Sequence, residues 1–346
     1  MDRRIIGFAF IFPLILLAGC TNTQTKSSSM LMSSFRCTLP SQPGVIDVEV
    51  TGFPSEIIAS TSDKEGSPVV FSIEFKNTIT GVDYPEDRIN IKYTFIPNIG
   101  KKYTKDVQID LAYYDPTSNQ ITPSTIYEQV ETKIPAGMSE MGVYRGVLRW
   151  EFIGKTKVYI PICIGYDPKI TKVSPEVMVC DPTSLPEPCY SASPVIVNIE
   201  SVKSIGAPRR GGSGIRGYYK IRFSLEDIYG GLDGCNGDYL SNTKRIKVDK
   251  IELKVDDLSI EEGGDIFRCY PLEKKDGKSY IYLRPSNEIV CYVYLDKLAD
   301  KCKQNNNCYL DENSLKLGKS AMISIKLEYD YCRSMSLGPA KIVTLP

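Results

Sequence analysis

The residues with the clearest chemical potential in this 346-residue chain are its eleven cysteines and its carboxylates, because the sequence contains no histidine. The commonest general base, the commonest zinc ligand and every Ser-His or Cys-His pair are therefore absent. Adjacent carboxylates occur at Glu261-Glu262 and Asp311-Glu312, but the two carboxylates of a glycosidase must face each other across a cleft. We therefore predict no catalytic residues, no cofactor and no enzymatic activity.

The cysteine nearest the N-terminus closes an apolar segment. Arg3 and Arg4 precede an apolar run from Ile5 to Leu17, and Ala18-Gly19-Cys20 follow. A basic head, an apolar run and small residues at the cut site are the three parts of a secretory signal. This segment resembles the lipobox signal of bacterial and archaeal lipoproteins. The resemblance implies that residues 1–20 are a signal peptide and that the Cys20 thiol carries a lipid that anchors the chain to a membrane.

The alternative for this segment is an uncleaved membrane helix, although the run is shorter than the ~20 residues that span a bilayer. In both cases the rest of the chain lies outside the cytoplasm. Residues 21–40 are mostly polar at their start and are expected to form a flexible tether.

The other cysteines favour disulfides. If Cys20 carries a lipid, ten cysteines remain, and an even set without C-x-x-C pairs is typical of up to five disulfides in an oxidising compartment. Zinc binding is the alternative, but without histidine or paired cysteine spacing we expect no metal. The count alone does not decide which cysteines are joined. The ten are Cys37, Cys163, Cys180, Cys189, Cys235, Cys269, Cys291, Cys302, Cys308 and Cys332.

The charge balance limits the partners. Forty-two basic and forty-two acidic residues give a formal net charge of zero, so the molecule as a whole has no field that attracts nucleic acid. We expect no nucleic-acid partner.

The hydrophobic pattern predicts an all-β protein. Apolar and polar residues alternate with period two in nearly every periodic stretch, and one short helix is expected at Leu295–Lys303. The expected strands are Val45–Val50, Val69–Phe75, Ile89–Phe95, Val107–Tyr113, Val143–Phe152, Lys157–Ile164, Val195–Val202, Tyr218–Leu225, Val248–Val255, Tyr280–Leu283, Ile289–Leu295, Met322–Tyr329 and Ile342–Leu345.

An internal repeat divides the chain into two similar halves. Ile73 and Phe75 match Ile221 and Phe223, and a run of alternating apolar residues from Ile160 matches one from Ile323. A repeat of this length indicates that one unit is built twice. We predict two tandem Ig-like β-sandwich domains, at 41–181 and 190–346, joined by the proline-rich segment Cys180–Cys189.

The first half also resembles cysteine-rich, Ig-like extracytoplasmic proteins of archaea, through Cys163-Ile-Gly-Tyr-Asp167 and Val177-Met-Val-Cys180. The resemblance implies a fold and a location, and no activity. On that layout the last two strands of the first domain are antiparallel, and Cys163 could face Cys180. In the second domain Cys269 and Cys291 could lie on neighbouring strands, and Cys302 with Cys308 could close a short loop.

The clearest candidate binding surface is a tyrosine-rich hairpin centred near Ser286. In that register four tyrosines would share its outward face, and tyrosine is favoured in recognition surfaces. The alternative is cross-strand pairing that only stabilises the sheet. The four are Tyr280, Tyr282, Tyr292 and Tyr294.

Three further features have structural alternatives. The glycine-rich loop 206–217 carries Arg209, Arg210 and Arg216 and could hold a phosphate or an acidic glycan, but it lacks nucleotide-loop spacing. The loop 233–238 has the oxygen side chains of a calcium site without its usual length. Leu148, Trp150 and Phe152 lie on one face of an expected strand, so Trp150 is expected in the core.

Together these features predict a membrane-anchored, extracytoplasmic protein of the binding or adhesion type. Its partners would be the membrane, through the lipid, and a protein or glycan of the cell envelope. The alternative is a structural subunit of an envelope or surface-appendage assembly, in which edge strands pair with other subunits.

Overall fold

The computed structural model describes residues 37–59, 66–135, 142–207, 214–232, 244–283, 288–305 and 308–344. The expected signal peptide, including Cys20, and most of the expected tether lie outside these residues. Within them nearly every long element is a β-strand in an antiparallel sheet. The all-β prediction is therefore confirmed.

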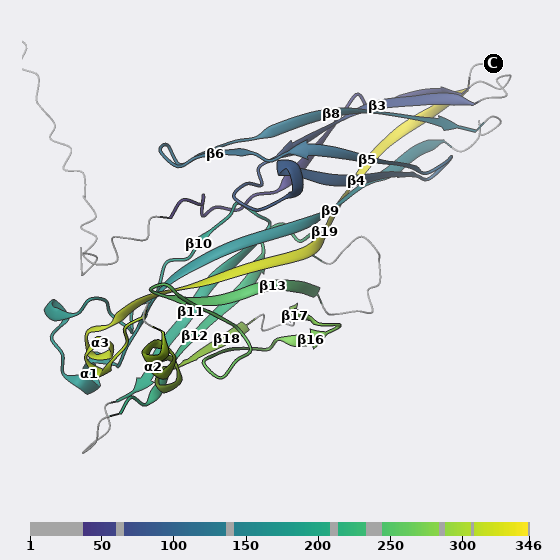
Figure 1. Ribbon diagram of the computed structural model, residues 1–346. Helices are drawn as coiled ribbons and strands as arrows, with labels where there is room; N and C mark the ends of the chain where they lie inside the picture. The colour runs from purple at the N-terminus through teal and green to yellow at the C-terminus, as the bar shows by residue number, and fades with distance from the viewer. Residues whose placement is uncertain are drawn as a thin grey trace, which may run out of the picture.

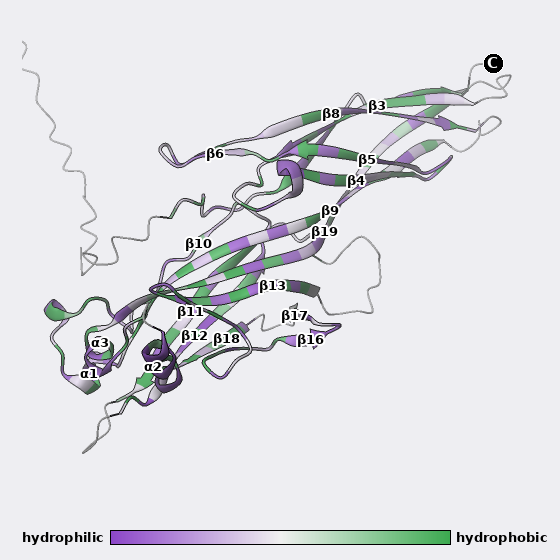
Figure 2. Cartoon of the chain, in the orientation of Figure 1, coloured by the Kyte–Doolittle hydropathy of each residue, from purple (hydrophilic) through white to green (hydrophobic). Residues whose placement is uncertain are grey.

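Two long strands run side by side through both halves of the molecule (Figure 1). β9 (Val143–Ile164) and β19 (Lys319–Thr344) pair antiparallel over almost their whole length. The sequence analysis expected two shorter strands in place of each, and this expectation was wrong. A polar stretch does not end a strand whose partner continues to supply hydrogen bonds. Figure 2 shows the hydropathy alternating along both strands.

The first sandwich packs a three-stranded sheet on one end of the β9/β19 pair. Its small sheet has the order β1 (Ile46–Thr51), β3 (Ser67–Asn77), β8 (Ser124–Ile134), and the facing sheet adds β4 (Arg88–Pro97) and β5 (Tyr103–Asp110) to β9. Alternate side chains of β3 are buried, as period-two patterning requires. The ring centroids of Phe71 on β3 and Phe95 on β4 lie 5.0 Å apart, so the two sheets share one aromatic core.

The second sandwich uses the other end of the same pair. Its separate sheet has the order β11 (Val195–Gly206), β12 (Gly217–Asp227), β18 (Glu288–Tyr294), β15 (Phe267–Tyr270). The facing sheet continues from β19 to β13 (Lys244–Val255), β17 (Lys278–Leu283) and β16 (Glu273–Lys275). The expected helix forms as α2 (Leu295–Gln304), whose Leu298 and Ala299 are buried.

Shorter elements complete the described fold. β2 pairs parallel with the end of β19, and β10 pairs with β9. Their bounds are β2 (Glu56–Ala59), η1 (Pro85–Asp87), β6 (Tyr113–Asp115), β7 (Gln120–Thr122), α1 (Pro168–Thr171), η2 (Pro175–Val177), β10 (Cys189–Tyr190), β14 (Leu258–Glu261) and α3 (Glu312–Leu317).

The two pairs of repeated segments are arranged differently: one pair lies in two separate sheets, and the other lies in a single sheet. β3 and β12, which carry the first matched segment, are inner strands of the two separate sheets. The second matched pair lies in one sheet, where Ile160 is directly opposite Ile323. The domain division at 41–181 and 190–346 stays a prediction. The two sandwiches share β9 and β19, and the C-terminal part of β19 pairs with the part of β9 that adjoins β4.

Disulfides add covalent links within the described fold. Four are described: Cys37–Cys189, Cys163–Cys180, Cys269–Cys291 and Cys302–Cys308. The last three are the pairs that the sequence analysis named, and all nine cysteines among the described residues are disulfide-bonded. The resemblance implies a strand that ends at Val177-Met-Val-Cys180, and no strand forms there. η2 and an irregular segment instead bring Cys180 to Cys163, where the Val179 backbone N–H donates to the Leu317 carbonyl at 2.7 Å.

Candidate functional site

The expected tyrosine hairpin does not form. β17 pairs with β13 and β16, whereas β18 pairs with β12 and β15, so the two strands belong to different sheets. Tyr280 is buried at 7% exposure, and the side chain of Tyr282 lies outside the described side chains. Strands adjacent in sequence need not pair, and here each finds its partner elsewhere in the sandwich. Of the expected patch, Tyr292 and Tyr294 lie together on β18.

Those two tyrosines belong to a different cluster, on the outer face of the β11-β12-β18-β15 sheet. The ring centroid of Tyr218 on β12 lies 5.4 Å from that of Tyr292 and 6.5 Å from that of Tyr294. Tyr270 on β15 lies 6.3 Å from Tyr292 and is 49% exposed. Interplanar angles of 61° to 68° give the edge-to-face packing that aromatic rings prefer. We call Tyr218, Tyr270, Tyr292 and Tyr294 the tyrosine face.

Strand alternation positions this face. On β12, Tyr219, Ile221 and Phe223 are buried, so the intervening side chains point away from the core. The cross-strand register then places Tyr218 opposite Tyr294. Because the core holds the inward side chains, the outward tyrosines are presented on a rigid sheet rather than on a loop.

A row of basic residues crosses the same face. The register places Lys203 of β11 opposite Lys220 of β12, Lys220 opposite Tyr292, and Tyr292 opposite Arg268 of β15. The Lys220 Nζ atom lies 5.7 Å from the Tyr292 ring centroid, a cation–π distance. Arg268 donates to Asp265 Oδ1 at 2.7 Å. We call Lys203, Lys220 and Arg268 the basic row.

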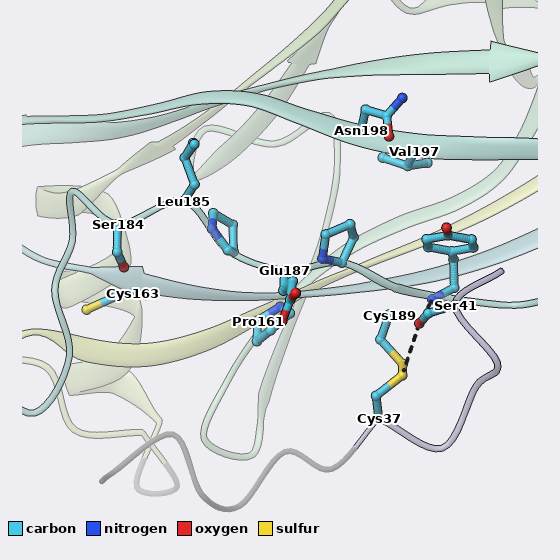
Figure 3. Close-up of a pocket in the computed structure, with 13 residues that line it drawn as sticks. Cys37, Ser41, Pro161, Cys163, Ser184, Leu185, Glu187, Cys189, Val197 and Asn198 are labelled. Atoms are coloured by element: carbon cyan, nitrogen blue, oxygen red, sulfur yellow. Dashed lines mark hydrogen bonds between the residues drawn. A yellow bond between two sulfur atoms is a disulfide. The ribbon is translucent and has the colours of Figure 1, made fainter. Parts of the chain in front are cut away.

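A cavity of about 660 Å³ lies between the proline-rich linker Cys180–Cys189 and strands β9 and β11 (Figure 3). Its volume falls in the range of small-molecule sites. Leu185, Pro186 and Glu187 of the linker form one side, and the Cys37–Cys189 disulfide lies at one end. Glu187 is the only carboxylate among its lining residues and has no basic partner there. The cavity therefore offers shape and apolar surface but no acid–base pair.

Tyr280 lines a smaller cavity of about 240 Å³ where the two sandwiches meet. Lys247 also lines it, and its Nζ lies 2.7 Å from Asp249 Oδ1 and 2.8 Å from Glu328 Oε1. The hydrogen bond to Asp249, with that to Glu328, raises the pKa of Lys247 above its usual value. A lysine with a raised pKa stays protonated near neutral pH and is a poor general base. The geometry therefore favours a structural ion-pair cluster.

The other sequence candidates fall in the core or outside the described residues. Trp150 is 3% exposed and donates from Nε1 to the Ile46 carbonyl at 3.2 Å, which confirms its core position. Arg209, Arg210 and the loop 233–238 lie outside the described residues, while Arg216 is exposed beside β12. In the described ranges no group of three or more Cys, Asp or Glu side chains is placed to hold a metal ion.

Sequence reasoning missed Tyr218 and Tyr270. A signal for Tyr218 was present, because the burial of Tyr219 on a period-two strand forces its neighbour outward. Nothing local marks Tyr270, because its place in the cluster depends on the pairing of β15 with β18.

The fold and face define an all-β, disulfide-bonded protein with an aromatic outer sheet face. No family model matches the chain, and the curated proteins contain no match. Among solved structures, the N-terminal domain of the Streptococcus gordonii adhesin Sgo0707 is 9% identical, with 87% of this chain and 90% of that chain covered and a TM-score of 0.12. The BSP domain of a biofilm associated protein is also 9% identical, with 87% and 57% covered and a TM-score of 0.10. At these scores neither similarity supports a conclusion about this chain.

Two findings bear on location. Disulfides are typical of proteins that fold outside the cytoplasm, and four are described here. In the part of the chain that the structure covers, every helix is too short or too polar to span a bilayer.

Proposed function

We propose that this protein is a non-catalytic, extracytoplasmic binding protein of the adhesion type, held to a membrane by a lipid on Cys20. It captures a protein or glycan of the cell envelope through the tyrosine face. The observation that carries the proposal is the cluster of four partly exposed tyrosines on one rigid sheet. Tyrosine provides a large contact area and a hydroxyl at low cost in conformational entropy, which is why binding surfaces are enriched in it.

The partly exposed position of these rings supports a binding role over a purely structural one. A tyrosine that only stabilises the sheet can be replaced by another β-former at a small cost, because one cross-strand pair contributes roughly 0.2–1 kcal/mol. A tyrosine at the centre of a binding surface costs about 2 kcal/mol or more of affinity when truncated. The two roles therefore predict different results for the same substitution.

Cosedimentation of the purified full chain with cell envelopes that have been freed of membrane lipid by detergent tests the proposal, because the lipid on Cys20 then has no membrane to enter. We expect Tyr218→Ser with Tyr292→Ser to weaken binding at least thirtyfold, because even one lost hot-spot side chain costs about 2 kcal/mol. The matched control is Tyr113→Ser with Tyr127→Ser, which removes two tyrosines that are 67% and 71% exposed on the first sandwich. Equal binding by the Tyr218/Tyr292 variant and the wild type would rule out the tyrosine face.

A structural role in an assembly is the second candidate, and β8 favours it. This eleven-residue strand is an edge of its sheet, and its pairing with β3 has no register shift. Long regular edges can pair with another chain. Sedimentation velocity across a hundredfold concentration range would show growing oligomers if β8 assembles copies of this chain, and a constant monomer would exclude that role.

A further inference from the structure

We propose that the tyrosine face and the basic row together bind an acidic polysaccharide, one whose sugar units carry carboxylates. This inference rests on the proposed function, because it names the ligand class of the same surface. It is carried by two lysines of the outer face of the β11-β12-β18-β15 sheet, Lys203 and Lys220, which lie opposite each other beside the tyrosines.

Two lysines of this face lie where their like charges repel. Lys203 and Lys220 lie directly opposite each other on neighbouring strands. Like charges in that position repel and destabilise a sheet. Among the described residues neither lysine forms an ion pair with a carboxylate, and Lys220 instead lies beside the Tyr292 ring. An anion placed between the two lysines would remove the repulsion and gain two charge-assisted hydrogen bonds.

Unlike the two lysines, the arginines of this face form ion pairs with carboxylates. Arg268 is paired with Asp265 at 2.7 Å, and Arg222 lies 3.5 Å from Glu288. Their charges are compensated by the protein itself. The two lysines are therefore the positions on this face that a negative ligand would neutralise.

The shape of the face favours a polysaccharide over a peptide. β12 and β18 are inner strands of their sheet, so their backbone groups are already paired and a peptide cannot add a strand on this face. The residues of the tyrosine face and the basic row line neither of the two cavities described above. The apolar faces of sugar rings can instead pack on tyrosine rings, whose hydroxyls can bond to sugar hydroxyls.

The dimensions fit a chain rather than a single sugar. Lys203 and Arg268 lie on β11 and β15, the two edge strands of this sheet. Three strand spacings separate them, which is about 14 Å. A linear polymer lying across the strands would contact Lys203, Lys220 and the Tyr292 ring in succession. Its next contact would be the Arg268 guanidinium, which already has a partner.

Polygalacturonate is a suitable probe, with neutral dextran as the uncharged polymer. We expect the purified full chain to bind polygalacturonate in isothermal titration calorimetry and not to bind dextran. Affinity should fall as salt rises from 50 to 500 mM, since exposed charges are screened. Lys203→Gln with Lys220→Gln should weaken binding about a hundredfold, because each lost charge-assisted hydrogen bond is worth about tenfold.

The matched control is Lys101→Gln with Lys102→Gln, which removes the same charge from exposed positions on the first sandwich. It should bind polygalacturonate as the wild type does. The Lys203/Lys220 variant should unfold at the same or a slightly higher urea concentration, because it loses a repulsion, so a binding loss cannot be attributed to misfolding.

Three results would overturn the inference: no binding of polygalacturonate, equal loss of binding in the control variant, or equally tight binding of poly-glutamate, which would indicate an acidic protein partner. If envelope binding depends on Tyr218 and Tyr292 but is unchanged in the Lys203/Lys220 variant, the proposed function stands and this inference fails. If both variants retain envelope binding, both fail.

Discussion

Gly154→Ala tests how tightly β9 and β19 are packed where the two sandwiches meet. Gly154 lies on a continuous strand directly opposite Tyr329. In an extended strand with open space, Gly→Ala stabilises a protein by about 0.4–1 kcal/mol, because alanine restricts the unfolded chain. Here a Cβ would lie 2.8 Å from Tyr329 Cδ2, 2.9 Å from Cζ and closer still to Cε2. The contact reverses the expected sign.

The Tyr329 ring cannot move aside without a cost. It is 3% exposed, and its hydroxyl lies 2.9 Å from Thr156 Oγ1. Overpacking a core costs about 1–3 kcal/mol, and losing that hydrogen bond costs about 1 kcal/mol more. The restriction of the unfolded chain by alanine offsets about 0.4–1 kcal/mol of this loss. We therefore expect Gly154→Ala to lower the free energy of unfolding by about 2 kcal/mol.

Urea unfolding measures this change as a lower midpoint with an unchanged m-value. Gly264→Ala is the control, because a Cβ at Gly264 meets no atom within 4 Å. Adding Tyr329→Leu to Gly154→Ala should recover stability relative to the sum of the single changes, because the two residues are in contact. A Gly154→Ala protein as stable as the wild type would refute the packing argument.

Three further changes should alter stability in ways that chemical unfolding can measure. Cys163→Ser with Cys180→Ser removes a disulfide of sequence separation 17 and should lower the free energy of unfolding of the non-reduced protein by about 3 kcal/mol. A urea midpoint unchanged from the wild type would contradict this. Trp150→Phe leaves the buried Ile46 carbonyl without its donor and should lower the free energy of unfolding by about 1–3 kcal/mol. A loss below about 0.5 kcal/mol would contradict the contribution of this hydrogen bond. The Ser314 side chain and backbone N–H hold the pKa of Asp311 at about 2 in the folded protein. Because that pKa is below its unfolded value near 3.9, the stabilisation by Asp311 is complete at neutral pH and is lost as pH falls from about 4 to about 2. Asp311→Asn should reduce the fall in urea midpoint between pH 4.5 and 2.5, and an equal fall in both proteins would exclude Asp311 as a source.

The candidate site could be predicted only in part. Tyr292 and Tyr294 share a face because they lie two residues apart on one strand, and alternation fixes that much. Their grouping with Tyr280 was wrong, because it assumed that consecutive strands pair. Tyr218 joins the cluster through the register of β12 with β18, which no local pattern encodes.

The sequence by itself determined the all-β class, the helix after β18 and a set of cysteines suited to disulfides. These properties follow from alternation and composition, which are read locally along the chain. Only the tertiary structure decided that β9 and β19 each continue through both sandwiches, that β17 and β18 enter different sheets, and that two lysines face each other beside the tyrosines. Pairing partners are chosen by burial across the whole core, so the same alternating strand is compatible with many neighbours until the fold selects one.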